Sequence, residues 1–171
     1  MTVVSDSSPL ISLARNDSLR LLPKLYAQIL VPAEVYNEVV ISGAGMTGAD
    51  LIARAGWIEV RPVKDREGLE EAIQKTRLGA GEMAAIMLAK EIAAGLTLID
   101  ERKARRYAKD EGLEVIGCVG ILETLYQRGH LADLRDAYRQ LLRHEFRIDR
   151  RALQESLARL KLPLLRDPSD P

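Results

Sequence analysis

The sequence predicts an α/β fold built on a mostly parallel sheet. Short runs rich in Val, Ile and Leu alternate along the chain with longer stretches that have the period of an amphipathic helix, and this alternation is typical of parallel sheets covered by helices. At 171 residues the chain is long enough for one domain with a small extension. Its hydrophobic content of 47% and charged content of 29% exclude a wholly disordered protein.

Five short runs are expected to form the sheet. The second of them is followed by Pro32, and the first and fourth each lead directly into an aspartate. The runs cover residues 2–5, 28–31, 57–60, 96–99 and 115–118.

Helices are expected between these strands. The first begins at Ser8 as N-cap with Pro9 at its first position, and Pro32 opens the second. Residues 80–94 have the strongest helical pattern, residues 101–111 form a basic helix, and a further helix ends near residue 128.

The C-terminal part differs, because residues 131–144 and 150–160 predict two amphipathic helices with no strand between them. We therefore expect an α/β domain over residues 1–128 and a helical extension over 129–171 packed on the same domain, with a flexible tail from about residue 163. The first of these helices has an apolar face that is expected to serve oligomerisation or partner docking. That face contains Leu131, Leu134, Tyr138, Leu141 and Leu142.

Composition also limits the compartment and the partners. No apolar stretch approaches the roughly 18 residues that span a bilayer, no signal peptide is visible, and the single Cys118 has no partner for a disulfide, so a cytoplasmic protein is expected. The net charge of zero argues against binding nucleic acid by bulk charge. However, residues 1–101 have a net charge of −4 and residues 102–171 one of +4, which suits a cation site with a polyanion nearby.

Four acidic residues are candidates for a metal site. Asp6 follows the first strand and Asp100 the fourth, so both point into the crevice at the carboxyl ends of the strands if these strands are neighbours. Glu38 lies one turn after Glu34 on the second helix, and Glu82 is the one acid near the start of an otherwise apolar helix.

Each acid also has a structural explanation. A helix dipole favours an acid at the position of Glu82, Glu38 fits a solvated face, and Asp6 and Asp100 could cap the helices that follow them. Together, however, several carboxylates share a crevice only with a cation between them. Oxygen ligands favour Mg²⁺ or Mn²⁺, and the matching chemistry is metal-assisted attack of water on a phosphodiester.

Four segments resemble the motifs of PIN-domain proteins. Residues 6–11 (Asp-Ser-Ser-Pro-Leu-Ile) are similar to the opening motif, residues 31–39 (VPAEVYNEV) to the second, and residues 78–82 (LGAGE) and 98–105 (LIDERKAR) to the third and fourth. The likeness covers roughly residues 1–128, in the right order and spacing. The group it resembles most is a prokaryotic PIN-like group of unknown function, close to the VapC-type toxins.

The resemblance implies a PIN-like three-layer α/β/α sandwich with a central parallel sheet of about five strands. It implies a Mg²⁺- or Mn²⁺-dependent endoribonuclease, the toxin of a type II pair with an antitoxin partner, and a homodimer. Ser8 corresponds to a position that orients a carboxylate or the scissile phosphate, and Glu101 extends the acidic group. The catalytic and metal-binding tetrad carried over from the family is Asp6, Glu38, Glu82 and Asp100.

A basic stripe follows Asp100 and is the expected contact for RNA phosphates. Residues three and four apart share one face of a helix. The alternative is a solvated helix whose charges are partly paired with Glu101 and Asp110. The stripe consists of Arg102, Arg105, Arg106 and Lys109.

Two other functions are alternatives to the ribonuclease. The first is a PIN-like regulatory module that binds nucleic acid or protein without cleaving, against which the complete tetrad argues. The second is a receiver-like or phosphatase-like domain with Asp6 as phosphoacceptor. A phosphatase of the haloacid type would have Asp-x-Asp, whereas Asp6 is followed by Ser7 and Ser8.

Overall fold

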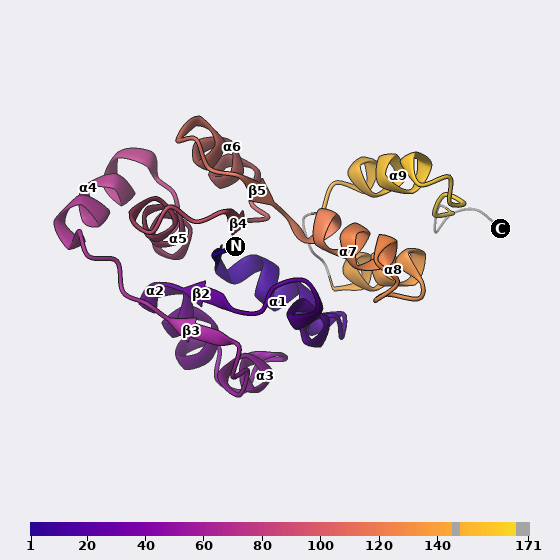
Figure 1. Cartoon of the computed structure of the whole chain (residues 1–171), viewed down its shortest axis with the longest axis horizontal. Coiled ribbons are helices and arrows are strands. Elements are labelled where there is room, and N and C mark those ends of the chain that lie inside the picture. Colours follow the sequence, from indigo (N-terminus) through magenta and orange to yellow (C-terminus); the bar gives the residue numbers. More distant parts are fainter. Residues whose placement is uncertain (145–147, 167–171) are drawn as a thin grey trace. The chain divides into compact units, whose positions relative to one another are not determined.

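The computed structural model describes residues 1–144 and 148–166. The chain divides into two compact units, Met1–Cys118 and Val119–Pro171, and Figure 1 shows their elements in sequence colours. The boundary predicted at residue 128 stays a prediction. No helix in the described ranges is long and apolar enough to cross a membrane.

The first unit is built on a five-stranded sheet in which every neighbouring pair is parallel. Each strand falls inside one of the five predicted runs, so the predicted parallel α/β sheet is confirmed. The strands are β1 (Val3–Ser5), β2 (Ile29–Val31), β3 (Ile58–Val60), β4 (Leu96–Leu98) and β5 (Val115–Ile116).

The strand order β3-β2-β1-β4-β5 places a switch point between β1 and β4. From β1 the chain adds β2 and β3 on one side, and then returns to add β4 and β5 on the other. The two central strands are in register, with Val4 beside Thr97 and Ser5 beside Leu98. Because ligands of such sheets bind where the strand order reverses, the carboxyl ends of β1 and β4 are the expected location of a site.

Helices cover both faces of this sheet. On one face Val4, Leu30 and Ile99 are buried with Met83 and Ile86 of α5 in a single apolar core. The opposite face is buried as well, since Val3, Ile29 and Val31 are each at most 1% exposed. Figure 1 shows α4, α5 and α6 grouped apart from α1 and α3. This is the predicted α/β/α sandwich, and it is confirmed.

The helices of the first unit include three that were not predicted: η1, α3 and α4. The sequence signal of α4 is weak because Leu69 is its one buried residue. The helix predicted from Pro32 is a short α-helix, α2, continued by a π-helical turn, η2. The bounds are α1 (Ser7–Arg15), η1 (Leu19–Lys24), α2 (Ala33–Tyr36), η2 (Asn37–Ser42), α3 (Ala49–Ala53), α4 (Arg66–Thr76), α5 (Ala80–Glu91) and α6 (Arg102–Asp110).

The second unit is helical, as the sequence predicted for this part of the chain. It contains most of α7 (Cys118–Gln127), then α8 (Leu134–Arg143) and α9 (Arg150–Arg159). Asp133 and Asp149 cap α8 and α9, each accepting a hydrogen bond from a backbone N–H of the first turn.

A polar network that runs from the buried Tyr138 to the exposed Arg159 joins these helices. The Ser156 hydroxyl donates to Glu123 at 2.9 Å and lies 2.7 Å from the Tyr138 hydroxyl, while Arg159 donates to Glu123 at 2.7 Å. Burial raises the pKa of Tyr138 to about 12, so its hydroxyl stays protonated and able to donate. The network fixes how α7, α8 and α9 pack together.

Most of the apolar face of α8 is buried within the chain. Leu134, Tyr138 and Leu141 are at most 1% exposed, so these three side chains do not form the free oligomerisation surface that the sequence suggested. Further along, Leu165 is buried and exchanges two hydrogen bonds with Gln154. The end of the predicted flexible tail, residues 167–171, lies outside the described residues.

Candidate active site

Asp6 is a buried carboxylate at the end of the central strand. The residue is 1% exposed. Its backbone N–H donates a hydrogen bond to the Leu98 carbonyl at 3.0 Å, which continues the hydrogen bonding between β1 and β4. Asp6, rather than Ser8 as the sequence suggested, is the N-cap residue of α1. The hydroxyls of Ser7 and Ser8 donate to its two carboxylate oxygens at 3.3 and 3.1 Å.

The surroundings of Asp6 oppose its negative charge. Burial raises its pKa from 3.8 to about 6, and the charges of Glu82 and Glu38 act in the same direction. The backbone N–H of Ser7 and the hydroxyl of Ser8 lower the pKa, but by less. Asp6 is therefore a carboxyl group that changes protonation close to neutral pH, a property that is enriched in functional sites.

Glu82 lies in the first turn of α5. Its Oε2 accepts a hydrogen bond from the Gly79 backbone N–H at 2.8 Å, which closes a capping arrangement at the start of the helix. Partial burial raises the pKa of Glu82, and the nearby charges of Glu101 and Glu38 raise it further. The Gly79 N–H and the Lys103 ammonium lower it. The helix dipole thus accounts for one carboxylate here, but not for the other acids that lie close to it.

Gly81 shows how near Glu38 comes to Asp6. A Cβ atom placed on Gly81 would lie 2.8 Å from the Oε2 of Glu38 and 3.5 Å from the Oδ1 of Asp6. The two carboxylate oxygens are therefore no farther apart than the sum of these distances. Glu38 belongs to η2 and is exposed. Its neighbour one turn earlier, Glu34, forms an ion pair with Arg66 instead.

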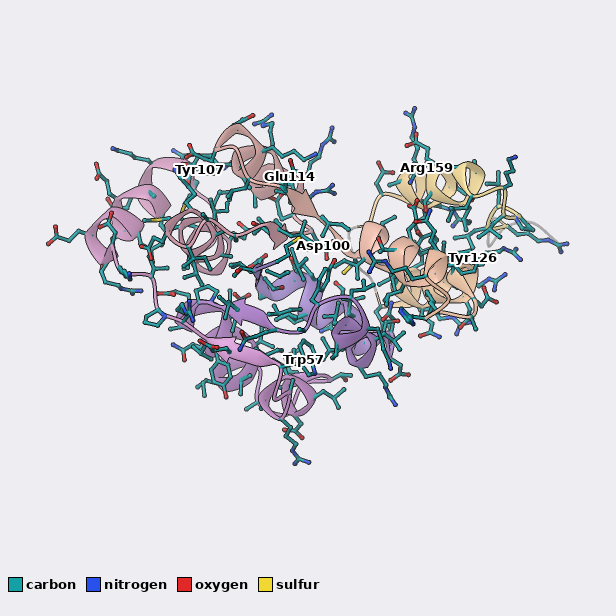
Figure 2. The ribbon with its side chains drawn as sticks, in the orientation of Figure 1. Trp57, Asp100, Tyr107, Glu114, Tyr126 and Arg159 are labelled. Carbon is teal, nitrogen blue, oxygen red and sulfur yellow. The ribbon has the colours of Figure 1, made fainter. Side chains whose placement is uncertain are left out.

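Asp100 follows β4 and points to a different set of groups. Its Oδ1 accepts a hydrogen bond from the backbone N–H of Cys118 at 2.7 Å, and a Cβ atom on Gly117 would lie within 3.5 Å of both this oxygen and the guanidinium of Arg105. Burial raises the pKa of Asp100, while Cys118 and Arg105 lower it. Its Oδ2 is buried and has no hydrogen-bond partner among the described residues. Figure 2 labels Asp100 where the chain leaves β4.

The structure thus brings Asp6, Glu38 and Glu82 together and holds Asp100 against other groups. Glu101, which the sequence placed at the edge of the acidic group, lies near enough to Glu82 to raise its pKa. Glu101 also caps α6, since its Oε2 accepts from the Ala104 N–H at 2.6 Å. Within residues 1–144 and 148–166, no three His, Cys, Asp or Glu side chains are gathered closely enough to hold a metal ion. The acids line one edge of the sheet without forming a coordination shell.

The donors at this edge nevertheless fit a hard divalent cation. They are all carboxylate oxygens, which Mg²⁺ and Mn²⁺ prefer. The unpartnered Oδ2 of Asp100 lacks the hydrogen bond that a buried polar atom normally has. The pKa of Asp6 is raised mainly by burial and further by the charges of Glu82 and Glu38. A bound cation would compensate both features.

The basic side chains of α6 divide into two kinds. Arg105 is half-buried beside Asp100, whereas Arg102, Arg106 and Lys109 are exposed. None of these four forms an ion pair with another residue that the structure describes, so pairing with Glu101 and Asp110 is not observed there. Lys103, also on α6, instead donates a hydrogen bond to the carbonyl of Thr76 at the end of α4, at 2.7 Å.

Two contributors to the site were not predicted from the sequence. The first is the backbone N–H of Cys118, which holds Asp100 because the predicted fifth strand ends at Ile116 and α7 begins at Cys118. The second is Gly81, whose lack of a side chain lets Glu38 and Asp6 approach α5. A backbone donor carries no residue-type signature, whereas a glycine inside a helical pattern is itself unusual and could have been noticed.

Comparison with known families supports the resemblance of the motifs. A family model described as PIN domain matches residues 2–162. The matched region contains all four acids of the predicted tetrad and continues through α8 and α9, beyond the roughly 128 residues over which the motifs are similar. Comparison with curated proteins gives no match.

The pKa of Asp6 predicts a pH dependence of stability in the metal-free protein. Because this pKa is about 6 in the folded state and 3.8 when exposed, folding favours the protonated form, and the free energy of unfolding falls as the pH rises from about 4 to above 6. The loss from Asp6 alone is about 3 kcal/mol. Urea unfolding in EDTA at a series of pH values measures it against an Asp6→Asn variant, which lacks this titration. The difference in the free energy of unfolding, variant minus wild type, should increase by about 3 kcal/mol from the low end of this pH range to the high end. If the free energy of unfolding changes with pH equally in the two proteins, Asp6 does not have the raised pKa.

Proposed function

The chain belongs to the PIN-domain family, and on this premise we propose that it is a divalent-metal-dependent endoribonuclease. The family indicates a nuclease-type fold that acts on nucleic acid, and RNA as the substrate and Mg²⁺ or Mn²⁺ as the cofactor are the finer parts of the proposal. The observation that carries it is Asp6, a carboxylate that is 1% exposed, lies at the switch point of the sheet and is faced by two further acids.

Asp6, Glu38, Glu82 and Asp100 would hold the metal ion. When bound, such an ion polarises the phosphodiester, lowers the pKa of water and stabilises the negative charge that develops during hydrolysis. Asp6 and Asp100 follow adjacent strands and are fixed by backbone and serine hydrogen bonds. Glu38 is exposed, so its side chain has the freedom to turn towards a cation, whereas the half-buried Glu82 is held at its Oε2 by the helix cap and has its Oε1 left for a ligand role.

The chain's own groups supply the proton transfer and the binding of phosphate. A carboxylate of the acidic group that is not bound directly to the cation can accept the proton of the attacking water, and neither the sequence nor the geometry selects one of the four for this role. The Ser7 and Ser8 hydroxyls hold the Asp6 carboxylate in one orientation. The exposed cations of α6 begin two residues after Asp100, where they can bind the phosphates on either side of the bond that is cleaved.

Two observations favour the alternative of a module that binds without cleaving. The carboxylates are not gathered into a metal site among the described residues, and the Oδ1 of Asp100 already accepts a hydrogen bond from the backbone N–H of Cys118. Incubating the purified protein with a mixed RNA pool in Mn²⁺ and in EDTA separates the two functions. Cleavage that requires Mn²⁺ supports the nuclease, whereas binding without cleavage in both conditions supports the module.

The finer biological setting belongs to the same proposal. We infer the toxin half of a toxin–antitoxin pair, because the motifs are similar to those of VapC-type toxins. We place the protein in the cytoplasm, where its one cysteine, the buried Cys118, remains a thiol. A homodimer would need a surface other than Leu134, Tyr138 and Leu141, since these side chains are buried in the chain.

Asp6→Asn and Asp100→Asn should each reduce Mn²⁺-dependent RNA cleavage by about a hundredfold or more, because each removes a charged ligand while keeping the side-chain volume. Cleavage of a labelled RNA measures the effect, and circular dichroism checks the fold. The matched control is Asp110→Asn, an exposed carboxylate on α6, which should keep wild-type activity. Persistence of cleavage in either test variant, or in EDTA, would rule out the metal mechanism.

Gly81→Ala should lower cleavage about tenfold while leaving the fold at least as stable. The added methyl would lie 2.8 Å from the Glu38 carboxylate and displace it, whereas alanine improves helix propensity by about 1 kcal/mol. Thermal unfolding and initial cleavage rates measure the two effects. The control is Gly56→Ala, where a Cβ atom meets open space. A Gly81→Ala protein with full activity would show that Glu38 does not contribute.

A further inference from the structure

The second unit contains a pocket of about 660 Å³ whose charged lining is entirely arginine. Its apolar part comes from Leu142 and Leu165. No acidic residue lines the pocket in the part of the chain that the structure describes. The basic lining consists of Arg135, Arg139, Arg143, Arg150 and Arg166.

Three of these arginines form a row along α8. Arg135, Arg139 and Arg143 are spaced by four residues, so they share one helix face and repeat about every 6 Å along its axis. Arg150 is the first residue of α9, and Arg166 follows that helix. Residues from three successive segments therefore converge on one pocket.

The charges in this pocket are not neutralised within the described residues. None of the five arginines forms an ion pair there, whereas Arg151 and Arg159, elsewhere on α9, pair with Glu155 and Glu123. Arg135 donates to the Leu164 carbonyl at 3.3 Å, but its Nε is buried and has no partner in the described ranges. Like charges so close together repel one another, and an anion in the pocket would relieve this repulsion.

The residue type and the spacing favour a phosphate chain over an acidic peptide. From Val119 onward the sequence has nine arginines and one lysine, and the planar guanidinium matches the two oxygens of a phosphate better than an ammonium does. A nucleic-acid strand has a negative charge at every unit, which suits a regular row of cations. A peptide has such charges only where Asp or Glu occurs.

We propose that this pocket binds the phosphate backbone of single-stranded RNA and provides a contact region additional to the cations of α6. The inference rests on the proposed function in one respect, namely that the substrate is RNA. Contacts of this kind position the strand without reading its sequence. They also weaken predictably as salt is added, because each one releases condensed counterions.

The test compares two double variants that lose the same charge. Arg139→Gln/Arg143→Gln alters exposed pocket residues, and Arg128→Gln/Arg151→Gln alters exposed arginines outside the pocket. Fluorescence anisotropy with a mixed-sequence RNA of about 12 nucleotides measures affinity in EDTA, where metal-dependent cleavage cannot occur. The titration is repeated from about 50 to about 200 mM NaCl.

The pocket variant should bind RNA about tenfold more weakly, and its plot of log affinity against log salt should be shallower by about 1.4, since each lost phosphate contact contributes about 0.7. The control variant should stay within about twofold of wild type. Equal losses in both variants, or no loss in the pocket variant, would overturn the inference. A pocket variant that binds RNA normally but loses polyglutamate would also overturn it and assign the pocket to an acidic peptide.

Failure of the proposed function is visible separately. Cleavage in Mn²⁺ is measured on the same proteins, and wild-type protein that binds RNA through the pocket but cleaves nothing would contradict the nuclease while leaving the pocket assignment intact. If the wild-type protein cleaves RNA and the pocket variant binds RNA with full affinity, the pocket assignment is contradicted while the nuclease is supported.

Discussion

The rest of the site depends on the burial of one carboxylate at the end of the central strand. Asp6 is 1% exposed, and its position is set by three features: the ladder bond to Leu98, the two serine hydroxyls and its place as N-cap of α1. A buried carboxylate is costly unless it is protonated or compensated by a cation. The raised pKa of Asp6 is a consequence of this unfavourable burial of the charged form. Glu82 and Glu38 increase the cost, which would be difficult to explain in a purely structural arrangement.

The fold places this buried carboxylate at the switch point of the sheet. The strand order puts β1 and β4 side by side, so the chain leaves the sheet at Asp6 and near Asp100 in the same region. Asp100 is held by the first N–H of α7, and the nearby guanidinium of Arg105 lowers its pKa. The acids therefore come from the β1 and β4 strand ends, the η2 turn and the start of α5, and cations of α6 follow directly along the chain. The proposed metal-dependent nuclease would use these carboxylates for the cation and the basic side chains for the phosphates.

The sheet was predictable because its strands have short, separate apolar runs, and Asp6 and Asp100 were recognisable because each directly follows such a run. The α4 helix was not predictable, since Leu69 is its one buried residue and the amphipathic signal is correspondingly weak. The relative orientation of the acids was also inaccessible. Motif order groups Asp100 with the tetrad, but the direction of its side chain depends on where α7 begins, and a backbone N–H has no sequence signature. The arginine pocket was hidden for a different reason, because its residues are dispersed between positions 135 and 166 and a balanced total charge conceals them.

The proposed function requires that a divalent cation bind at the acidic edge and displace the proton of Asp6. Calorimetric titration of Mn²⁺ into the metal-free protein at a pH of about 5.5, in two buffers of different ionisation enthalpy, measures both binding and the number of protons released. Wild-type protein should bind Mn²⁺ and release close to one proton, since Asp6 is mostly protonated at that pH. The Asp6→Asn variant should lose both the affinity for Mn²⁺ and the released proton. Binding of Mn²⁺ that is equally strong in Asp6→Asn, or no binding to wild type, would contradict the proposed function.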